Sequence, residues 1–177
     1  DTPPSPPGAW ENYVKAAAVR LSSASRGALL GMDALFGGDI PSSAGLSSSS
    51  ALVIAAALAL CEANDLHFDR TELAEMMAEG ERYVGTQGGG MDQAVCLLGE
   101  RGAALRIDFF PLRHAAVPFP EGFTVVAAHS LVRAAKTENA LLLYNRRPAE
   151  CRLATALING LHAPDPPMNR LGDLPRT

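Results

Sequence analysis

The stretch PSSAGLSSSSALVIAAALAL, residues 41–60, constrains the fold of this chain more than any other part of its sequence. Small and aliphatic residues dominate its second half, and they predict a helix over Leu46–Asn64. The longest apolar stretch of the chain, Ala51–Cys61, is too short to cross a bilayer. The chain is therefore predicted to be globular and soluble, with this helix buried.

The other sequence patterns predict a mixture of helices and strands around this helix. Further helices are expected over Trp10–Ser23, Thr71–Val84, Met91–Leu98 and Thr137–Leu161, the second of them N-capped by Asp69. Pro148 lies inside the last range and should either kink the helix or mark a junction. Strands are expected over residues 26–36, 103–109 and 123–130. These elements favour the α+β class, with the α/β class as the alternative.

Charge and cysteine content narrow the expected partners and compartment. The net charge of −4, the pI near 5.5 and the lack of a lysine and arginine cluster argue against a nucleic-acid partner. The cysteines at positions 61, 96 and 151 have no zinc-site spacing and are expected to be structural thiols in a reducing compartment. We therefore expect a cytoplasmic protein that binds small molecules, without a membrane or nucleic-acid partner.

The serines ahead of the long helix form a candidate phosphate-binding loop. Pro41 and Gly45 favour a turn, and Ser47–Ser50 bring hydroxyl groups to the point where backbone N–H groups are still unpaired. Such N–H groups and the positive end of the helix dipole bind phosphate, and the hydroxyls could reach a metal ion. The lysine of a Walker-type loop is absent. The alternative is a serine-rich loop that only caps a buried helix.

A second candidate site lies in the stretch GERYVGTQGGGMDQ, residues 80–93. Its three consecutive glycines allow the backbone to approach a ligand closely, and Asp92 just beyond them could accept a proton or orient a hydroxyl group. Glu81 lies on the expected helix that leads into this loop and could turn its carboxylate toward the same cleft. The alternative is an ordinary loop in which Asp92 N-caps the next helix.

In this order, the two stretches resemble the galactokinase branch of the GHMP kinase superfamily (galactokinase, homoserine kinase, mevalonate kinase and phosphomevalonate kinase). IPSSAGLSSSSA is similar to the second family motif, P-x-x-x-G-L-x-S-S-S, and GTQGGGMDQ is similar to the loop that carries the catalytic aspartate. The stretches AWENYVKA, LRIDFFPLRHAAVPFP and VVAAHSLVRAAKTENALLLYNRRPAECRLA extend the resemblance over almost the whole chain. It is closest to the eukaryote-type branch, which contains plant galactokinases and N-acetylgalactosamine kinase.

The resemblance implies most of a two-layer α+β kinase domain of the ribosomal protein S5 domain 2-like type over residues 1–120. Residues 121–177 would begin a second α+β domain. The first family motif, which recognises galactose, and the third motif are both absent from the sequence. We therefore expect a central fragment with an incomplete fold and no measurable turnover on its own. The arginine that usually partners the catalytic aspartate belongs to the first motif.

The resemblance also implies roles for individual residues. Asp92 would be the catalytic base or orienting group, and Gly90 and Tyr144 would contact the sugar alongside it. Trp10 would stack on adenine, although Trp10 and Tyr144 could instead be core residues. Mg²⁺ would be coordinated by Glu81 and the hydroxyls of Ser48 and Ser49, since such oxygens suit this cation. The ATP phosphates would be held by Gly45, Leu46, Ser47, Ser48 and Ser49.

The implied activity is that of a sugar 1-kinase, which uses ATP and Mg²⁺ to convert D-galactose to α-D-galactose 1-phosphate. Two alternatives are N-acetylgalactosamine as the substrate, or a sensor that binds galactose and ATP without catalysis. Such sensors lack residues in the serine loop, whereas the loop here is complete, and this favours an enzyme. A full-length protein of this kind is expected to be a monomer.

Overall fold

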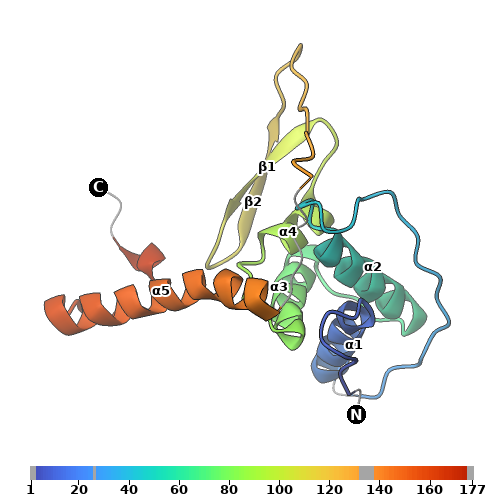
Figure 1. The fold of residues 1–177 in the computed structure, drawn as a ribbon, viewed down its shortest axis with the longest axis horizontal. Helices are drawn as coiled ribbons and strands as arrows, with labels where there is room; N and C mark the ends of the chain where they lie inside the picture. The colour runs from blue at the N-terminus through green and yellow to red at the C-terminus, as the bar shows by residue number, and fades with distance from the viewer. Residues whose placement is uncertain (1–2, 26, 132–137, 175–177) are drawn as a thin grey trace. The chain divides into compact units, whose positions relative to one another are not determined.

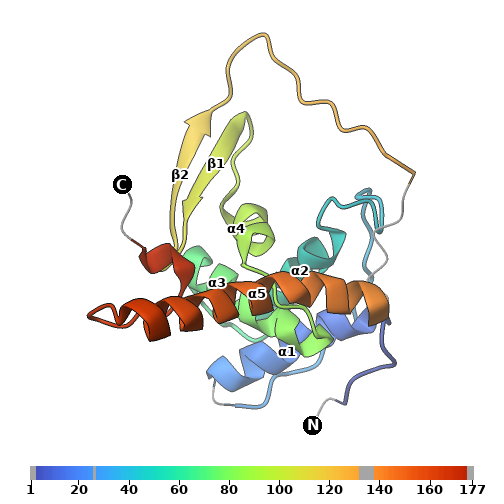
Figure 2. The same cartoon turned by 60° about the vertical axis from the view of Figure 1, so that its left-hand side comes forward.

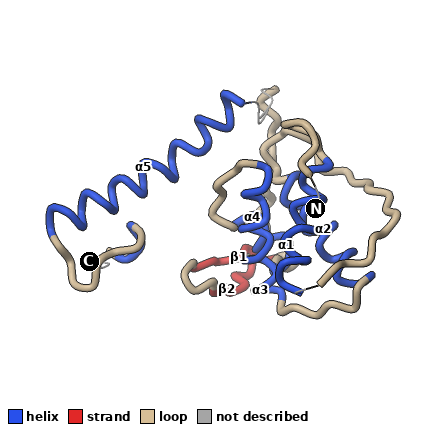
Figure 3. Tube along the Cα trace, turned by 90° about the horizontal axis from the view of Figure 1, so that it is seen from below, coloured by secondary structure: helices blue, strands red, loops and turns tan. Residues whose placement is uncertain are grey.

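The computed structural model describes residues 3–25, 27–131 and 138–174, which belong to two units. The first unit, Asp1–Ala135, contains helices α1–α4, the 3-10 helix η1 and a two-stranded sheet. The second unit, Lys136–Thr177, contains helix α5 and the 3-10 helix η2. Figure 3 shows these helices and strands along the chain, and their mixture confirms the predicted α+β class. The predicted domain boundary near residue 120 stays a prediction, because a compact unit need not coincide with a family domain.

Helix α2, Ser48–Ala63, is the helix predicted from the apolar stretch, and it contacts α1, α3 and α4. Alanine and leucine give the segment a high helix propensity, and its buried residues recur at three- and four-residue spacing along one side of the helix. The helix begins two residues later than predicted, because Ser47 has a left-handed φ of 56°. Figures 1 and 2 show α1, Glu11–Ser25, packed along it.

The core of the first unit lies where these helices meet α3, Arg70–Gly80. Leu21, Val53 and Met77 are fully buried in one cluster, one from each of α1, α2 and α3. Burial of a side chain of this size contributes about 1.5–3 kcal/mol to folding. The helices therefore form a packed scaffold that can hold the loops between them in place.

Asp69 is the N-cap of helix α3, as predicted, and the helix begins at Arg70, one residue before the predicted start. The Asp69 carboxylate accepts hydrogen bonds from the backbone N–H groups of Thr71, at 2.8 Å, and Glu72, at 3.4 Å. These bonds, the one from Thr71 most, lower the pKa of this carboxyl. The predicted helix over residues 71–84 ends as the 3-10 helix η1, Glu81–Val84, after which a glycine-rich loop leads into α4, Met91–Leu98.

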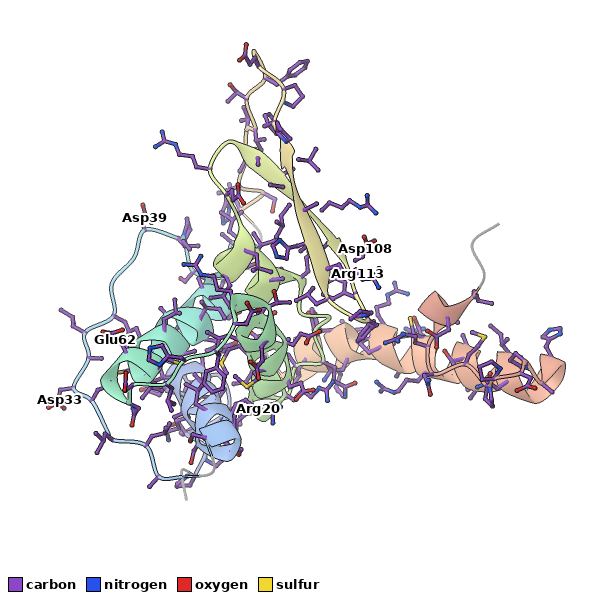
Figure 4. The ribbon with its side chains drawn as sticks, turned by 180° about the vertical axis from the view of Figure 1, so that it is seen from behind. Arg20, Asp33, Asp39, Glu62, Asp108 and Arg113 are labelled. Atoms are coloured by element: carbon purple, nitrogen blue, oxygen red, sulfur yellow. The ribbon has the colours of Figure 1, made fainter. Side chains whose placement is uncertain are left out.

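Strands β1, Ala103–Asp108, and β2, Arg113–Pro118, form an antiparallel hairpin. Ala103 pairs with Pro118 at one end and Asp108 with Arg113 at the turn end, where Figure 4 shows the latter two residues side by side. β1 contacts α4, while every residue of β2 is exposed. β1 confirms the strand predicted over residues 103–109, whereas β2 was not predicted because its exposed residues show no alternation of apolar and polar side chains.

The strands predicted over residues 26–36 and 123–130 are wrong as far as the structure describes these segments. Residues 27–39 form a loop between α1 and α2, on which Asp33 and Asp39 lie (Figure 4), and residues 123–130 have no regular structure either. A strand is stable only when its backbone pairs with a neighbour, and in the described sheet β1 and β2 pair only with each other. The apolar residues of the segments 26–36 and 123–130 match a strand pattern, but neither segment has a neighbouring strand to pair with in the described sheet.

Helix α5, Glu138–His162, confirms the predicted helix and continues through Pro148. The Asn159 side chain fixes the segment after it, because its amide donates to the Met168 carbonyl at 2.8 Å and accepts from the Met168 N–H at 3.0 Å. Tyr144 belongs to this second unit and is 48% exposed. Within the described residues, none of the helices has the length and apolar character that a transmembrane span requires.

Candidate functional site

The serine loop gives helix α2 an uncapped start. Ser47 is the N-cap residue, but its side chain makes no capping hydrogen bond, and the helix ladder begins with the Ala51 N–H bonded to the Ser47 carbonyl at 3.0 Å. The N–H groups before Ala51 therefore have no acceptor within the helix. The alternative interpretation, a serine-rich loop that only caps the helix, lacks the expected side-chain hydrogen bond at the N-cap residue Ser47.

The backbone of this loop turns repeatedly through the left-handed region. Ser43, Gly45 and Ser47 have φ values of 57°, 76° and 56°, and the N-cap residue is the last of them. Left-handed residues are components of the concave backbone nests that bind anions. A Cβ atom on Gly45 would meet no other atom within 4 Å, so the space beside this residue is open. Open space and N–H groups without acceptors within the helix suit an anionic ligand.

Glu81 is the buried carboxylate of the site. It is 5% exposed at the start of η1, and its Oε1 atom accepts a hydrogen bond from the Ser50 hydroxyl at 2.9 Å. Ser50 lies in the first turn of α2, so this bond joins the serine loop to the end of α3. The Thr86 hydroxyl also donates to the Glu81 carbonyl oxygen at 3.2 Å, which ties the following loop to the same residue.

Tyr13 of α1 adds a third element to this neighbourhood. Burial raises the pKa of its hydroxyl, the negative charge of Glu81 raises it further, and a side-chain hydrogen bond with Ser49 acts in the opposite direction. Ser49, Ser50 and Glu81 therefore lie around one point, although they come from different parts of the chain. Tyr13 was missed because its helical spacing in the sequence fits an ordinary core residue equally well.

The second loop also leads into an uncapped helix with a left-handed start. Gly90, with φ of 86°, is the N-cap residue of α4, and Asp92 follows in the first turn of that helix. The alternative interpretation, in which Asp92 is the N-cap, is therefore wrong. Gln93 is 3% exposed, whereas Asp92 is partly exposed. Asp92 is thus available to a ligand at the positive end of the α4 dipole, which stabilises a carboxylate there.

Cys96 shows that the two carboxylates share one environment. Burial raises the pKa of its thiol, and the charges of Asp92 and then of Glu81 raise it further. Asp92 lies one helical turn before Cys96 on α4, and Glu81 at the start of η1 is near enough for its charge to act on the thiol. The structure therefore brings together three predicted site residues, Ser49, Glu81 and Asp92.

Other predicted site residues lie apart from this group or cannot be placed relative to it. Trp10 is 53% exposed and stacks edge-on against Phe36, with the ring centroids 6.0 Å apart, so it is not a core residue. Leu46 is a half-exposed loop residue, and Ser48 is the first residue of α2. Tyr144 belongs to the second unit, so its distance from the site is not defined.

The donor atoms at Glu81 fit a hard divalent cation. Among the described salt bridges, none involves Glu81, so no described cationic side chain offsets the charge of this buried carboxylate. The described residues contain no cluster of three or more acidic, histidine or cysteine ligands. One carboxylate with nearby hydroxyls is the type of site at which Mg²⁺ binds together with substrate phosphates and water.

The family model of the GHMP kinases N terminal domain matches residues 12–100, which include both loops. The galactokinase of Dictyostelium discoideum is 41% identical over an alignment of 152 positions, which covers 84% of this chain and 30% of that protein. The galactokinase of Schizosaccharomyces pombe is 32% identical over 84% of the chain, and that of Roseiflexus sp. is 38% identical over 82%. The chain covers 32% and 37% of these two proteins, so it spans about a third of its relatives' length.

Gly90 offers a test of how tightly the second loop is held. A Cβ atom at this position would lie 3.0 Å from the Ala78 Cβ on α3, and the φ of 86° disfavours any side chain. We expect Gly90→Ala to lower the free energy of unfolding by about 1–2 kcal/mol or more. Gly89→Ala is the matched control, because a Cβ atom there meets nothing within 4 Å. Urea denaturation checks this, and equal stability of the two variants would show that the loop is not packed against α3.

Proposed function

We propose, because the chain belongs to the GHMP kinase family, that its protein is an ATP-dependent galactokinase forming α-D-galactose 1-phosphate. The galactokinases of Dictyostelium discoideum and Schizosaccharomyces pombe support galactose as the acceptor. The observation that carries the proposal is the meeting of two uncapped helix starts beside the buried Glu81, with Asp92 on the second of them. A cytoplasmic location and a monomeric state stay predictions.

The serine loop would bind the ATP phosphates. Its backbone N–H groups and the positive end of α2 favour negative charge, and positive φ at Gly45 leaves the backbone open to close approach. In this proposal the phosphates lie along the segment Gly45, Leu46, Ser47, Ser48 and Ser49. Trp10, outside the core, would be available to stack on adenine.

Glu81 would coordinate Mg²⁺ together with the hydroxyls of Ser48 and Ser49. The cation, when held by these residues, would supply positive charge that offsets the negative charge developing during phosphoryl transfer. Glu81 is held ready for this role, since its Oε1 atom is fixed by Ser50 and the side chain is shielded from water. The lack of a cationic partner among the described side chains is then explained, because the metal supplies the positive charge.

Asp92 would accept the proton of the anomeric hydroxyl or orient that hydroxyl for attack. As the new O–P bond forms, the bond between the γ-phosphorus and the bridging oxygen breaks, and the proton passes to the Asp92 carboxylate. Gly90 would bring its backbone close to the sugar, and Tyr144 stays a predicted sugar contact. Phosphoryl transfer depends mainly on such alignment and charge stabilisation.

Removal of the Asp92 carboxylate tests the role on the acceptor side. In the intact protein that carries this sequence, we expect Asp92→Ala to lower kcat for galactose phosphorylation by about 10²–10⁴-fold, the contribution of a positioned base. The affinity for Mg-ADP should stay unchanged, because Asp92 serves the sugar. Asp108→Ala, which removes an exposed carboxylate paired with Arg106, is the control. A coupled ADP-release assay measures kcat, and calorimetry measures the affinity for Mg-ADP. An Asp92→Ala protein with the wild-type kcat would refute the role.

Substitution of Gly45 tests the role on the donor side. Gly45→Val should weaken Mg-ADP binding by tenfold or more, since the loss of one charge-assisted hydrogen bond costs about 1.5–3 kcal/mol. Gly122→Val controls for backbone strain, because Gly122 also has a positive φ, 80°, and open space around it. Equal Mg-ADP affinity of the two variants in a calorimetric titration would remove the phosphate-binding role of the loop.

A further inference from the structure

Ser50 and Gln93 form a buried link between the serine loop and the loop of Asp92. The Gln93 amide nitrogen donates to the Ser50 hydroxyl oxygen at 3.3 Å, and that hydroxyl donates to Glu81 Oε1 at 2.9 Å. The three side chains are each at most 5% exposed. In the proposed reaction, neither Ser50 nor Gln93 contacts a substrate or the cation.

The chemistry of these groups gives the link a direction. A serine hydroxyl has one hydrogen to donate and lone pairs to accept, while an ionised carboxylate can only accept. The hydrogen of Ser50 therefore points to Glu81, and its lone pair faces the Gln93 amide. Because a hydrogen bond to a charged acceptor is stronger than a neutral one, the bond to Glu81 fixes the Ser50 hydroxyl most firmly.

The same link sets the position of Asp92. Adjacent helical residues point about 100° apart, so the buried Gln93 side chain fixes the rotation of the first turn that carries the partly exposed Asp92. The Gly90 N-cap has no side chain to hold this turn. The contact between Gln93 and Ser50 supplies that restraint, and it does so from the first turn of α2.

We propose that Ser50 and Gln93 are positioning residues, which hold the Glu81 carboxylate and the Asp92 helix turn in one fixed geometry for phosphoryl transfer. This role rests on the proposed kinase function. Ser50 acts on Glu81 directly, whereas Gln93 acts on the Asp92 turn through its bond to Ser50. Neither side chain needs to contact a substrate, because the effect is on the placement of groups that do.

The test compares Ser50→Ala, Gln93→Met and the double variant in the intact protein. Gln93→Met should lower kcat about tenfold, the value of one hydrogen bond of about 1.4 kcal/mol. Ser50→Ala, which breaks both bonds of the link, should lower kcat at least as much. The KM for galactose, and the KM for ATP at saturating Mg²⁺, should stay unchanged. The double variant should lose no more than Ser50→Ala alone, since that change already breaks the bond to Gln93. Ser23→Ala is the control, because the hydroxyl of this exposed helical serine bonds to the Val19 carbonyl one turn earlier, at 2.9 Å.

A second measurement separates the two halves of the link without relying on turnover. Calorimetric titration of ADP at a series of Mg²⁺ concentrations measures how much Mg²⁺ strengthens ADP binding. In Ser50→Ala, which frees Glu81, this strengthening should be about tenfold smaller. Gln93→Met should leave this dependence unchanged, because the Ser50 hydroxyl still donates to Glu81. If Ser50→Ala does not fold, Ser50→Cys replaces it, since a thiol nearly keeps the volume and donates only weakly.

The outcomes separate this role from the proposed function. A wild-type protein that phosphorylates galactose, with both single variants at the wild-type kcat, would overturn the positioning role alone. Losses that multiply to about a hundredfold in the double variant would also overturn it, because the two residues would then act independently. A wild-type protein without galactose phosphorylation would remove the proposed function and this role together.

Discussion

The buried carboxylate of Glu81 is the constraint on which the rest of the site depends. A charge with 5% exposure is stable in a protein only if hydrogen bonds or an opposite charge compensate for its lost hydration. Ser50 supplies one hydrogen bond from α2, and no described ion pair supplies the opposite charge. The elements that surround Glu81 are therefore held close together at a point that still favours a cation.

The helical core makes this arrangement possible because it fixes where α2 and α4 begin. The fully buried Leu21, Val53 and Met77 hold α1, α2 and α3 together, and α4 packs against α2 and α3. Left-handed residues at Ser47 and Gly90 then end each loop at an uncapped helix start. Two positive helix ends beside one buried carboxylate suit the transfer of a phosphoryl group between two bound substrates.

The sequence predicted the helices well because their hydrophobic pattern and caps are local properties. Asp69 capped α3 as expected, and the apolar stretch became α2. The strands predicted over residues 26–36 and 123–130 failed because strand pairing depends on a partner that the local pattern does not reveal. The serine run and the glycine-rich loop pointed to Ser49, Glu81 and Asp92, and the family resemblance gave them roles, whereas Ser50 and Gln93 contact each other across distant segments of the chain. In the sequence, only the position of Ser50 within the serine run and the position of Gln93 beside Asp92 could have pointed to these two residues.

The most direct test of this account is where a metal binds when nucleotide is present. Crystals of the intact protein grown with Mn²⁺ and ADP, measured at the manganese absorption edge, would locate the cation by its anomalous signal. We predict a manganese peak about 2.2 Å from a Glu81 carboxylate oxygen, with the ADP phosphates against the serine loop and Ser50 still bonded to Oε1. A peak that lies beyond coordinating distance of Glu81, or phosphates bound away from residues 45–49, would contradict the account.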